Sequence, residues 1–238
     1  ILSGAPHDPR PHPRRGSRQP HGRIAASRVR SMELGHVVYM VSDLPRAVAE
    51  LSGRGLAVEY GSATRPRNAL AYFSQGPYLE LLRDTGVPRL LGALASRSRS
   101  PRMQALARLS SWNRRSGLCA LCLEGTQDEF EAAAAVLGGG LRTGSRSRTD
   151  PSGRTLSYEA FFPADPDLPF VMTHFSVDPR PRDFTHPGGA RCISRIELPL
   201  PEAKQALVRS LCPDPALVLT PAGTPMRATL DDGTTLGP

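Results

Sequence analysis

The sequence predicts an α+β protein built from paired β-α-β-β-β units, and three observations lead to this prediction. Short runs rich in β-branched and aromatic residues, typical of strands, surround one amphipathic helix in each unit. The same order of elements recurs, starting at Gly35 and again 82 residues later at Gly117. A shorter third copy starts at residue 193. With 39% hydrophobic residues, the chain can bury a substantial core.

The first unit opens with the strand "HVVYMV", which follows Gly35. Leu44, Val48 and Leu51 then recur at i, i+4 and i+7 and predict a helix, which ends near Gly53. Three strands follow this helix, each bounded by Gly, Pro or polar turn residues. We expect these strands at residues 56–62, 68–74 and 78–83.

The second unit has the stronger helix signal. Thr126 and Glu129 form a capping box, and "GGG" at 138–140 ends the helix. Strands are expected at 155–162 and 169–176, with a weaker candidate at 142–148.

The remaining segments complete the predicted organisation. Residues 1–31 contain five Pro and few core-forming residues, which predicts disorder. The chain divides into an Arg/Pro-rich tail (1–31), a first unit (32–92), a linker with one short helix (93–116), a second unit (117–176) and a third partial β-α-β-β unit (177–238).

Charge and hydropathy exclude two classes of partner. The net charge is +8, but residues 1–31 hold seven Arg and one acid, which leaves 23 basic and 21 acidic residues elsewhere. A nearly neutral fold argues against nucleic-acid binding. The sequence contains no run of about 18–20 apolar residues, so it predicts no membrane span. Four cysteines are typical of a reduced, cytoplasmic protein, although the Arg-rich tail leaves organellar targeting open. The oligomeric state is not determined by the sequence.

The order and spacing of several motifs resemble the glyoxalase-like domain family, within the vicinal oxygen chelate superfamily that includes glyoxalase I and extradiol dioxygenases. The motifs that carry this resemblance are "GHVVYMVSDLPRAV", the Asn of "RNALAYF", "PYLELL", "GSRSRTDPSG", "LPFVM" and "HPGGARCISRIEL". The resemblance covers residues from about 34 to about 235. It implies that two units pair into a half-open cup, with a metal or a small substrate inside.

The resemblance also implies that His36 and Glu80 lie together on the concave wall of the cup. Strand periodicity places His36 on the same face as Val38, and Glu80 on the same face as Tyr78 and Leu82. A carboxylate among apolar neighbours requires a cation, a hydrogen-bond network or water.

A divalent metal (Fe, Zn, Mn or Ni) is the cofactor that the resemblance implies. The repeat aligns His36 with Leu118, which cannot be a ligand, and Glu80 with Thr173 or His174. If His174 faces the cup, then His36, Glu80 and His174 form a set of two His and one carboxylate. If the register differs by one residue, only two ligands remain, and the cup binds its ligand without a metal.

Four further residues are predicted to bind substrate. They are Asn68, Arg146, Arg148 and His186. Arg forks bind carboxylates and phosphates, although a solvated hairpin also explains the two arginines. A backbone turn likewise explains His186, and a cap or turn explains Asn68.

The sequence therefore favours an enzyme of the lyase/isomerase or dioxygenase type that acts on a small oxygen-rich organic molecule. Glu80 is expected to act as metal ligand or general base, and His36 as ligand. The alternative is a metal-free protein that binds or sequesters a small molecule without turnover.

Overall fold

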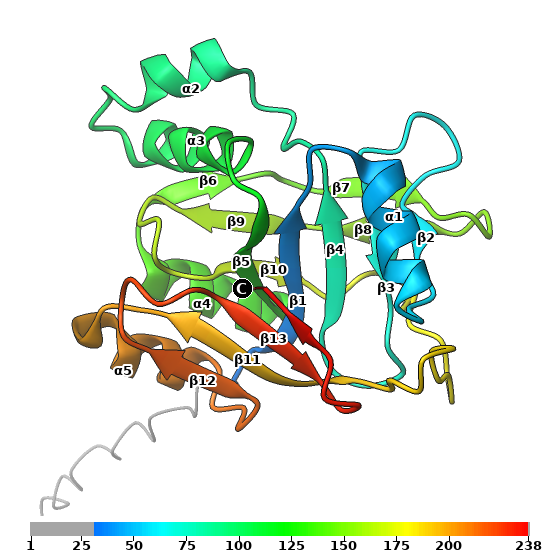
Figure 1. Ribbon diagram of the computed structural model, residues 1–238. Helices are drawn as coiled ribbons and strands as arrows, with labels where there is room; N and C mark the ends of the chain where they lie inside the picture. The colour runs from blue at the N-terminus through cyan, green and yellow to red at the C-terminus, as the bar shows by residue number, and fades with distance from the viewer. Residues whose placement is uncertain (1–30, 238) are drawn as a thin grey trace, which may run out of the picture.

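The computed structural model describes residues 31–237 and confirms the α+β class (Figure 1). The expectation of a disordered tail falls almost entirely outside this range. The first unit has the predicted order of elements. It consists of β1 (Glu33–Met40), α1 (Leu44–Gly53), β2 (Glu59–Tyr60), β3 (Asn68–Ala71) and β4 (Tyr78–Leu82).

Two helices connect the first unit to the second, where the sequence predicted one. They are α2 (Arg89–Ala95) and α3 (Pro101–Trp112). The second unit follows and consists of β5 (Gly117–Gly125), α4 (Gln127–Leu137), β6 (Gly140–Arg142), β7 (Arg146–Thr149), β8 (Thr155–Tyr158), β9 (Ala160–Pro163) and β10 (Phe170–Thr173).

The third unit forms a separate four-stranded sheet. Its elements are β11 (Ile193–Pro199), α5 (Glu202–Leu211), β12 (Leu217–Thr220), β13 (Arg227–Leu230) and β14 (Thr235–Leu236). The strands lie in the order β12-β11-β13-β14. None of the helices within residues 31–237 combines the length and the apolar content needed to cross a membrane.

The first two units share one eight-stranded sheet with the order β2-β3-β4-β1-β5-β10-β9-β6. β1 lies parallel to β4 and β5 lies parallel to β10, while β1 and β5 are antiparallel and join the two units. One face of the sheet packs against α1, α4 and the third unit in a single apolar cluster that includes Leu121, Phe130 and Ile196. The other face, with Val38 and Phe170, packs partly against α3 through Trp112. This second face forms the cup.

The predicted strand 155–162 is divided at Glu159, which belongs to neither strand. β8 pairs only with β7 in a two-stranded sheet, whereas β9 continues the large sheet beside β10. The structure makes Cys122, and not Leu118, the equivalent of His36. His36 pairs with Tyr78 at the start of β4, and Cys122 pairs with Phe170 at the start of β10. Leu118 instead packs against the apolar cluster on the far face.

The capping box of α4 gives a first stability prediction. Thr126 accepts a hydrogen bond from the Glu129 backbone, and the Glu129 side chain accepts one from the Thr126 backbone. We expect Thr126→Ala to lower the free energy of unfolding by about 1 kcal/mol, because a helix N–H loses its acceptor. Ser100→Ala is the matched control, since Ser100 stands at the same position of α3 without a side-chain capping bond. Equal effects of the two variants in chemical denaturation would contradict the prediction.

Candidate functional site

A cavity of about 750 Å³ opens on the cup face of the large sheet. Its wall is mainly apolar and aromatic, with contributions from both units and from α3. The apolar and aromatic lining residues are Val38, Leu70, Tyr78, Leu82, Val87, Leu106, Leu109, Trp112, Leu141, Tyr158, Ala160, Phe162, Phe170, Met172 and Phe175. The polar lining includes His36, Asn68, Glu80 and four arginines. This volume suits a small organic molecule.

The structure brings His36 and Glu80 together on the wall of this cavity. The parallel register of β1 and β4 sets Val38 opposite Glu80, so His36 and Glu80 are diagonal neighbours. The distance from His36 Nε2 to Glu80 Oε2 is 3.4 Å. Asn68 Nδ2 donates a hydrogen bond of 2.8 Å to the other oxygen of Glu80. The Glu80 carboxylate therefore has a donor at each oxygen, and its side chain remains 18% exposed.

A second carboxylate lies on the other side of the His36 ring. The distance from His36 Nδ1 to Glu124 Oε1 is 3.3 Å, and Arg180 Nη2 donates a hydrogen bond of 2.9 Å to Glu124 Oε2. His36 also stacks on Tyr78 with ring centroids 4.6 Å apart. We name the connected residues Asn68, Glu80, His36, Glu124 and Arg180 the His36 cluster.

Sequence reasoning missed Glu124 and Arg180. Arg180 lies in a Pro-rich segment without periodicity, which gave no signal. Glu124 offered one, since it is an acid near the end of the otherwise apolar strand β5. Gly35 makes room for it, because a Cβ at Gly35 would lie only 2.4 Å from Glu124 Cγ. The absence of a side chain at Gly35 therefore leaves the space that the Glu124 side chain occupies beside His36.

The charges of the His36 cluster follow from these contacts. Burial alone would lower the pKa of His36, but Cys122, Glu124 and Glu80 raise it well above 6.5. Burial raises the pKa of Cys122 to about 11, so this thiol is neutral and the carboxylates hold the proton on His36. Burial would likewise raise the pKa of Glu80 and Glu124, yet His36 lowers both, assisted by Asn68 at Glu80 and Arg180 at Glu124. At neutral pH the cluster contains two cations and two anions.

A divalent metal, which the family resemblance implies, does not fit this donor set. The ligand atoms of His36, Cys122 and Glu124 lie within 4.8 Å of one another, and all three residues are buried. However, these groups are already engaged: His36 contacts both Glu80 and Glu124, and Arg180 Nη2 donates a hydrogen bond to Glu124. A metal ion here would have to displace Arg180 from Glu124 and the protons of His36 and Cys122. Among the described residues that line the cavity, His36 and Glu80 lie together, whereas the third acidic or imidazole side chain, Asp84, pairs with Arg67 and Arg83. Two adjacent donors are too few for a tight site.

The structure does not bring His174 to this site. His174 follows the end of β10 and is not among the residues lining the cavity, whereas Met172 and Phe175 are. Its backbone N–H instead donates to Gly125. β10 ends at Thr173, so the strand alternation that the sequence argument used does not continue to His174.

His186 lies on the far side of the sheet and does not line the cavity. It is buried between Phe73 and Phe184, and its Nδ1 accepts a hydrogen bond of 2.9 Å from Ala57 N–H. The turn that follows brings Gly188 against Gly55. In this position His186 fastens a loop and cannot reach a ligand in the cup.

Arg146 and Arg148 both line the cavity. Two residues apart on β7, they share one face of the β7–β8 sheet. Arg148 donates to the Tyr72 hydroxyl and, at 3.3 Å, to the carbonyl of Gly61, and its guanidinium lies 5.4 Å from the Phe175 ring. These contacts connect β7 to the segment between β2 and β3 through Gly61 and to the ends of β3 and β10 through Tyr72 and Phe175.

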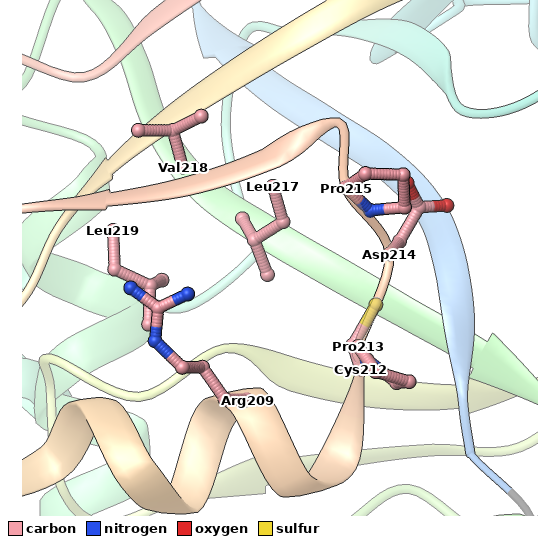
Figure 2. Close-up of a pocket in the computed structure, with 8 residues that line it drawn as sticks. All are labelled: Arg209, Cys212, Pro213, Asp214, Pro215, Leu217, Val218 and Leu219. Atoms are coloured by element: carbon pink, nitrogen blue, oxygen red, sulfur yellow. The ribbon is translucent and has the colours of Figure 1, made fainter.

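A second depression, of about 390 Å³, lies between α5 and β12 in the third unit (Figure 2). Figure 2 shows Leu217 and Leu219 directed toward α5, and Arg209 and Asp214 at different ends of the group. Burial raises the pKa of Cys212, which makes its thiol a poor nucleophile. This depression has no pair of groups comparable to His36 and Glu80.

The paired units, the shared sheet and the one-sided cavity define a vicinal oxygen chelate protein. Residues 34–211 match the family model described as "Glyoxalase-like domain", and the chain belongs to this family. No curated protein sequence matches the chain.

Solved structures with a similar arrangement have low sequence identity. A hypothetical protein from Staphylococcus aureus is 13% identical with a TM-score of 0.49, covering 86% of this chain and 84% of its own. The methylmalonyl-CoA epimerase of Streptomyces coelicolor, in complex with 2-nitronate-propionyl-CoA, is 15% identical with a TM-score of 0.37, covering 60% and 96%. A xylose isomerase-like TIM barrel/4-hydroxyphenylpyruvate dioxygenase fusion protein is 16% identical with a TM-score of 0.37, covering 89% and 33%.

Proposed function

We propose that the protein is an enzyme that removes a proton from a carbon atom beside a carbonyl group in a small organic substrate, with Glu80 as general base. The observation that carries this proposal is an ionised carboxylate held in a fixed position on the wall of a largely apolar cavity. Two donors, Asn68 and His36, fix its position. A positioned carboxylate that stays ionised can accept a proton from a bound substrate.

The proton and the electron pair are accounted for within this site. When the C–H bond breaks, Glu80 takes the proton and the electron pair moves to the carbonyl oxygen as an enolate. The arginines of the cavity provide a positive potential for the developing negative charge. Return of the proton from Glu80 to a different carbon of the delocalised enolate shifts a double bond and completes an isomerisation without a co-reactant, whereas return to the same carbon gives only hydrogen exchange.

His36 acts on Glu80 as a positioning residue in this scheme. Its protonated ring holds Glu80 Oε2 and is itself held by Glu124. The donor set favours proton transfer over the dioxygenase type, which requires metal ligands that these residues do not offer.

One observation favours a second function, binding without turnover. Both oxygens of Glu80 already have partners, and its pKa is lowered despite burial, so it is a weak base. A protein with this cavity and an inactive carboxylate would sequester its ligand.

Hydrogen exchange separates the two functions. The protein is incubated in D₂O with a panel of 2-oxo acids, 3-oxo acids and their esters, and the loss of carbon-bound hydrogen signals is followed by NMR. The enzyme exchanges at least one substrate, and Glu80→Gln loses that exchange. Exchange that persists in Glu80→Gln, or binding without any exchange in the wild type, overturns the proposal.

A further inference from the structure

We propose that the ligand of the cavity is an anionic aromatic molecule, with its anionic group at Arg146 and Arg148 and its ring against Trp112, Phe162 and Phe170. This inference deepens the proposed function, because it states the substrate class of the same site.

The lining of the cavity has an excess of positive charge. Arg65 and Arg67 come from the segment between β2 and β3, and Arg146 and Arg148 come from β7. Two carboxylates, Glu80 and Asp84, are the acids of the lining within residues 31–237. His36 holds Glu80, and Asp84 is within ion-pair distance of Arg67 and Arg83. Within residues 31–237 neither acid forms an ion pair with β7, although Glu80 attracts Arg148 at longer range.

Arg146 and Arg148 keep their charge uncompensated by any ion pair. Among the residues that the structure describes, neither is within 4.0 Å of a carboxylate oxygen. The described hydrogen-bond partners of Arg148 are neutral, the Gly61 carbonyl and the Tyr72 hydroxyl. These partners hold its guanidinium in place without cancelling the charge. Two guanidinium groups on one strand face are suited to bind a carboxylate or a phosphate.

The aromatic part of the cavity lining is suited to a flat ring. Phe162 and Phe170 stack with ring centroids 4.8 Å apart, and Trp112 lies 5.8 Å from Phe170. Phe170 also meets the His36 ring edge-on at 5.4 Å, so the aromatic wall continues to the His36 cluster. An aromatic ligand would gain area burial and ring contacts there. A neutral or purely aliphatic ligand would use only one of these two features.

Trp112 is the single tryptophan of the chain and lines the cavity, so its fluorescence reports on occupancy. Four probes differ in one feature each: 3-phenylpropanoate, 2-phenylethyl phosphate, the neutral 3-phenylpropan-1-ol and the saturated 3-cyclohexylpropanoate. We expect at least one aromatic anion to bind about tenfold or more tighter than the alcohol, and tighter than the saturated acid, with affinity falling as salt is raised. The tighter anion identifies carboxylate or phosphate.

Arginine variants locate the anionic group. The double variant Arg146→Ala/Arg148→Ala is expected to lose roughly tenfold or more in affinity for the aromatic anion, and Arg146→Ala alone about threefold. The single variant guards against a folding defect, because the Arg146 side chain is exposed and, within residues 31–237, forms no hydrogen bond or ion pair. Arg195→Ala on β11 removes the same charge from the third unit and is expected to leave affinity unchanged.

Equal affinity for the alcohol and both anions, or full affinity in the double variant, overturns the inference. If 3-cyclohexylpropanoate binds more tightly than 3-phenylpropanoate, the inference that the ligand is aromatic is overturned. Glu80→Gln is expected to keep its affinity for the aromatic anion, because the anionic group binds at Arg146 and Arg148 and not at Glu80. Lost exchange in Glu80→Gln without any anion preference would leave the proposed function standing and refute only the substrate class.

Discussion

Glu80→Gln is expected to lower the rate of substrate hydrogen exchange by a factor of about 10²–10⁴, the usual contribution of a general base. Gln keeps the size of the side chain and can still accept a hydrogen bond from Asn68, whose Nδ2 lies 2.8 Å from the carboxylate. What it lacks is an ionisable oxygen that can take the proton. NMR exchange rates under saturating substrate would measure this loss.

Two controls isolate the chemical role of Glu80. Glu50→Gln removes an exposed carboxylate on α1 and is expected to leave the exchange rate unchanged. Fluorescence of Trp112 in Glu80→Gln is expected to show that the cavity still fills with ligand. A Glu80→Gln protein that exchanges hydrogen within about threefold of the wild type would rule out Glu80 as the base.

Glu124→Gln is expected to lower the free energy of unfolding by about 3 kcal/mol. Glu124 is 1% exposed and faces two cations, His36 at 3.3 Å and Arg180 at 2.9 Å. An amide still accepts a hydrogen bond but removes the buried counter-charge of Arg180, while His36 keeps Glu80 as its second carboxylate, which places the loss near the lower end for a broken buried pair. Urea denaturation followed by Trp112 fluorescence and circular dichroism would give the value.

Asp178→Asn is the matched control, because Asp178 is the other carboxylate paired with Arg180. It is 67% exposed, so the expected cost is below about 0.5 kcal/mol. A similar loss in both variants would show that Arg180, and not the buried position of Glu124, determines the stability.

The stabilising effect of Glu124 has a defined pH dependence. Burial alone would raise its pKa, but His36 and Arg180 lower it below the ordinary value of 4.5. Its contribution is therefore complete above 4.5 and is lost as the pH falls through the lower value of the folded state. The difference between the wild type and Glu124→Gln should shrink in acid. A difference that grows below 4.5 would contradict the assigned direction.

The helices and the order of the elements could be predicted because their signals are local. The capping box of Thr126 and Glu129 and the glycines after Leu137 define α4 within a dozen residues. Likewise, strand alternation placed His36 and Glu80 on faces that the structure turns into the same cavity. The residues between the units were less predictable. There the spacing of Leu and Ala allowed one helix, and the structure has two, α2 and α3.

The partners of His36 could not be read from the sequence. Glu124 reaches His36 only through the irregular antiparallel pairing of β1 and β5 and through the space at Gly35. His174 was predicted from strand alternation, which stops at Thr173. His186 lies in a motif that resembles one of the family, yet its side chain packs against Phe73 on the face of the sheet away from the cup.

The sequence by itself determined the repeated β-α-β-β-β pattern through periodicity, and the order and spacing of its motifs carried the family resemblance that implied a common wall for His36 and Glu80. Only the tertiary structure decided that His36 lies between two carboxylates and holds a proton. The physical reason is that this charge state depends on burial and on strand register across 88 residues of separation, which no local pattern encodes.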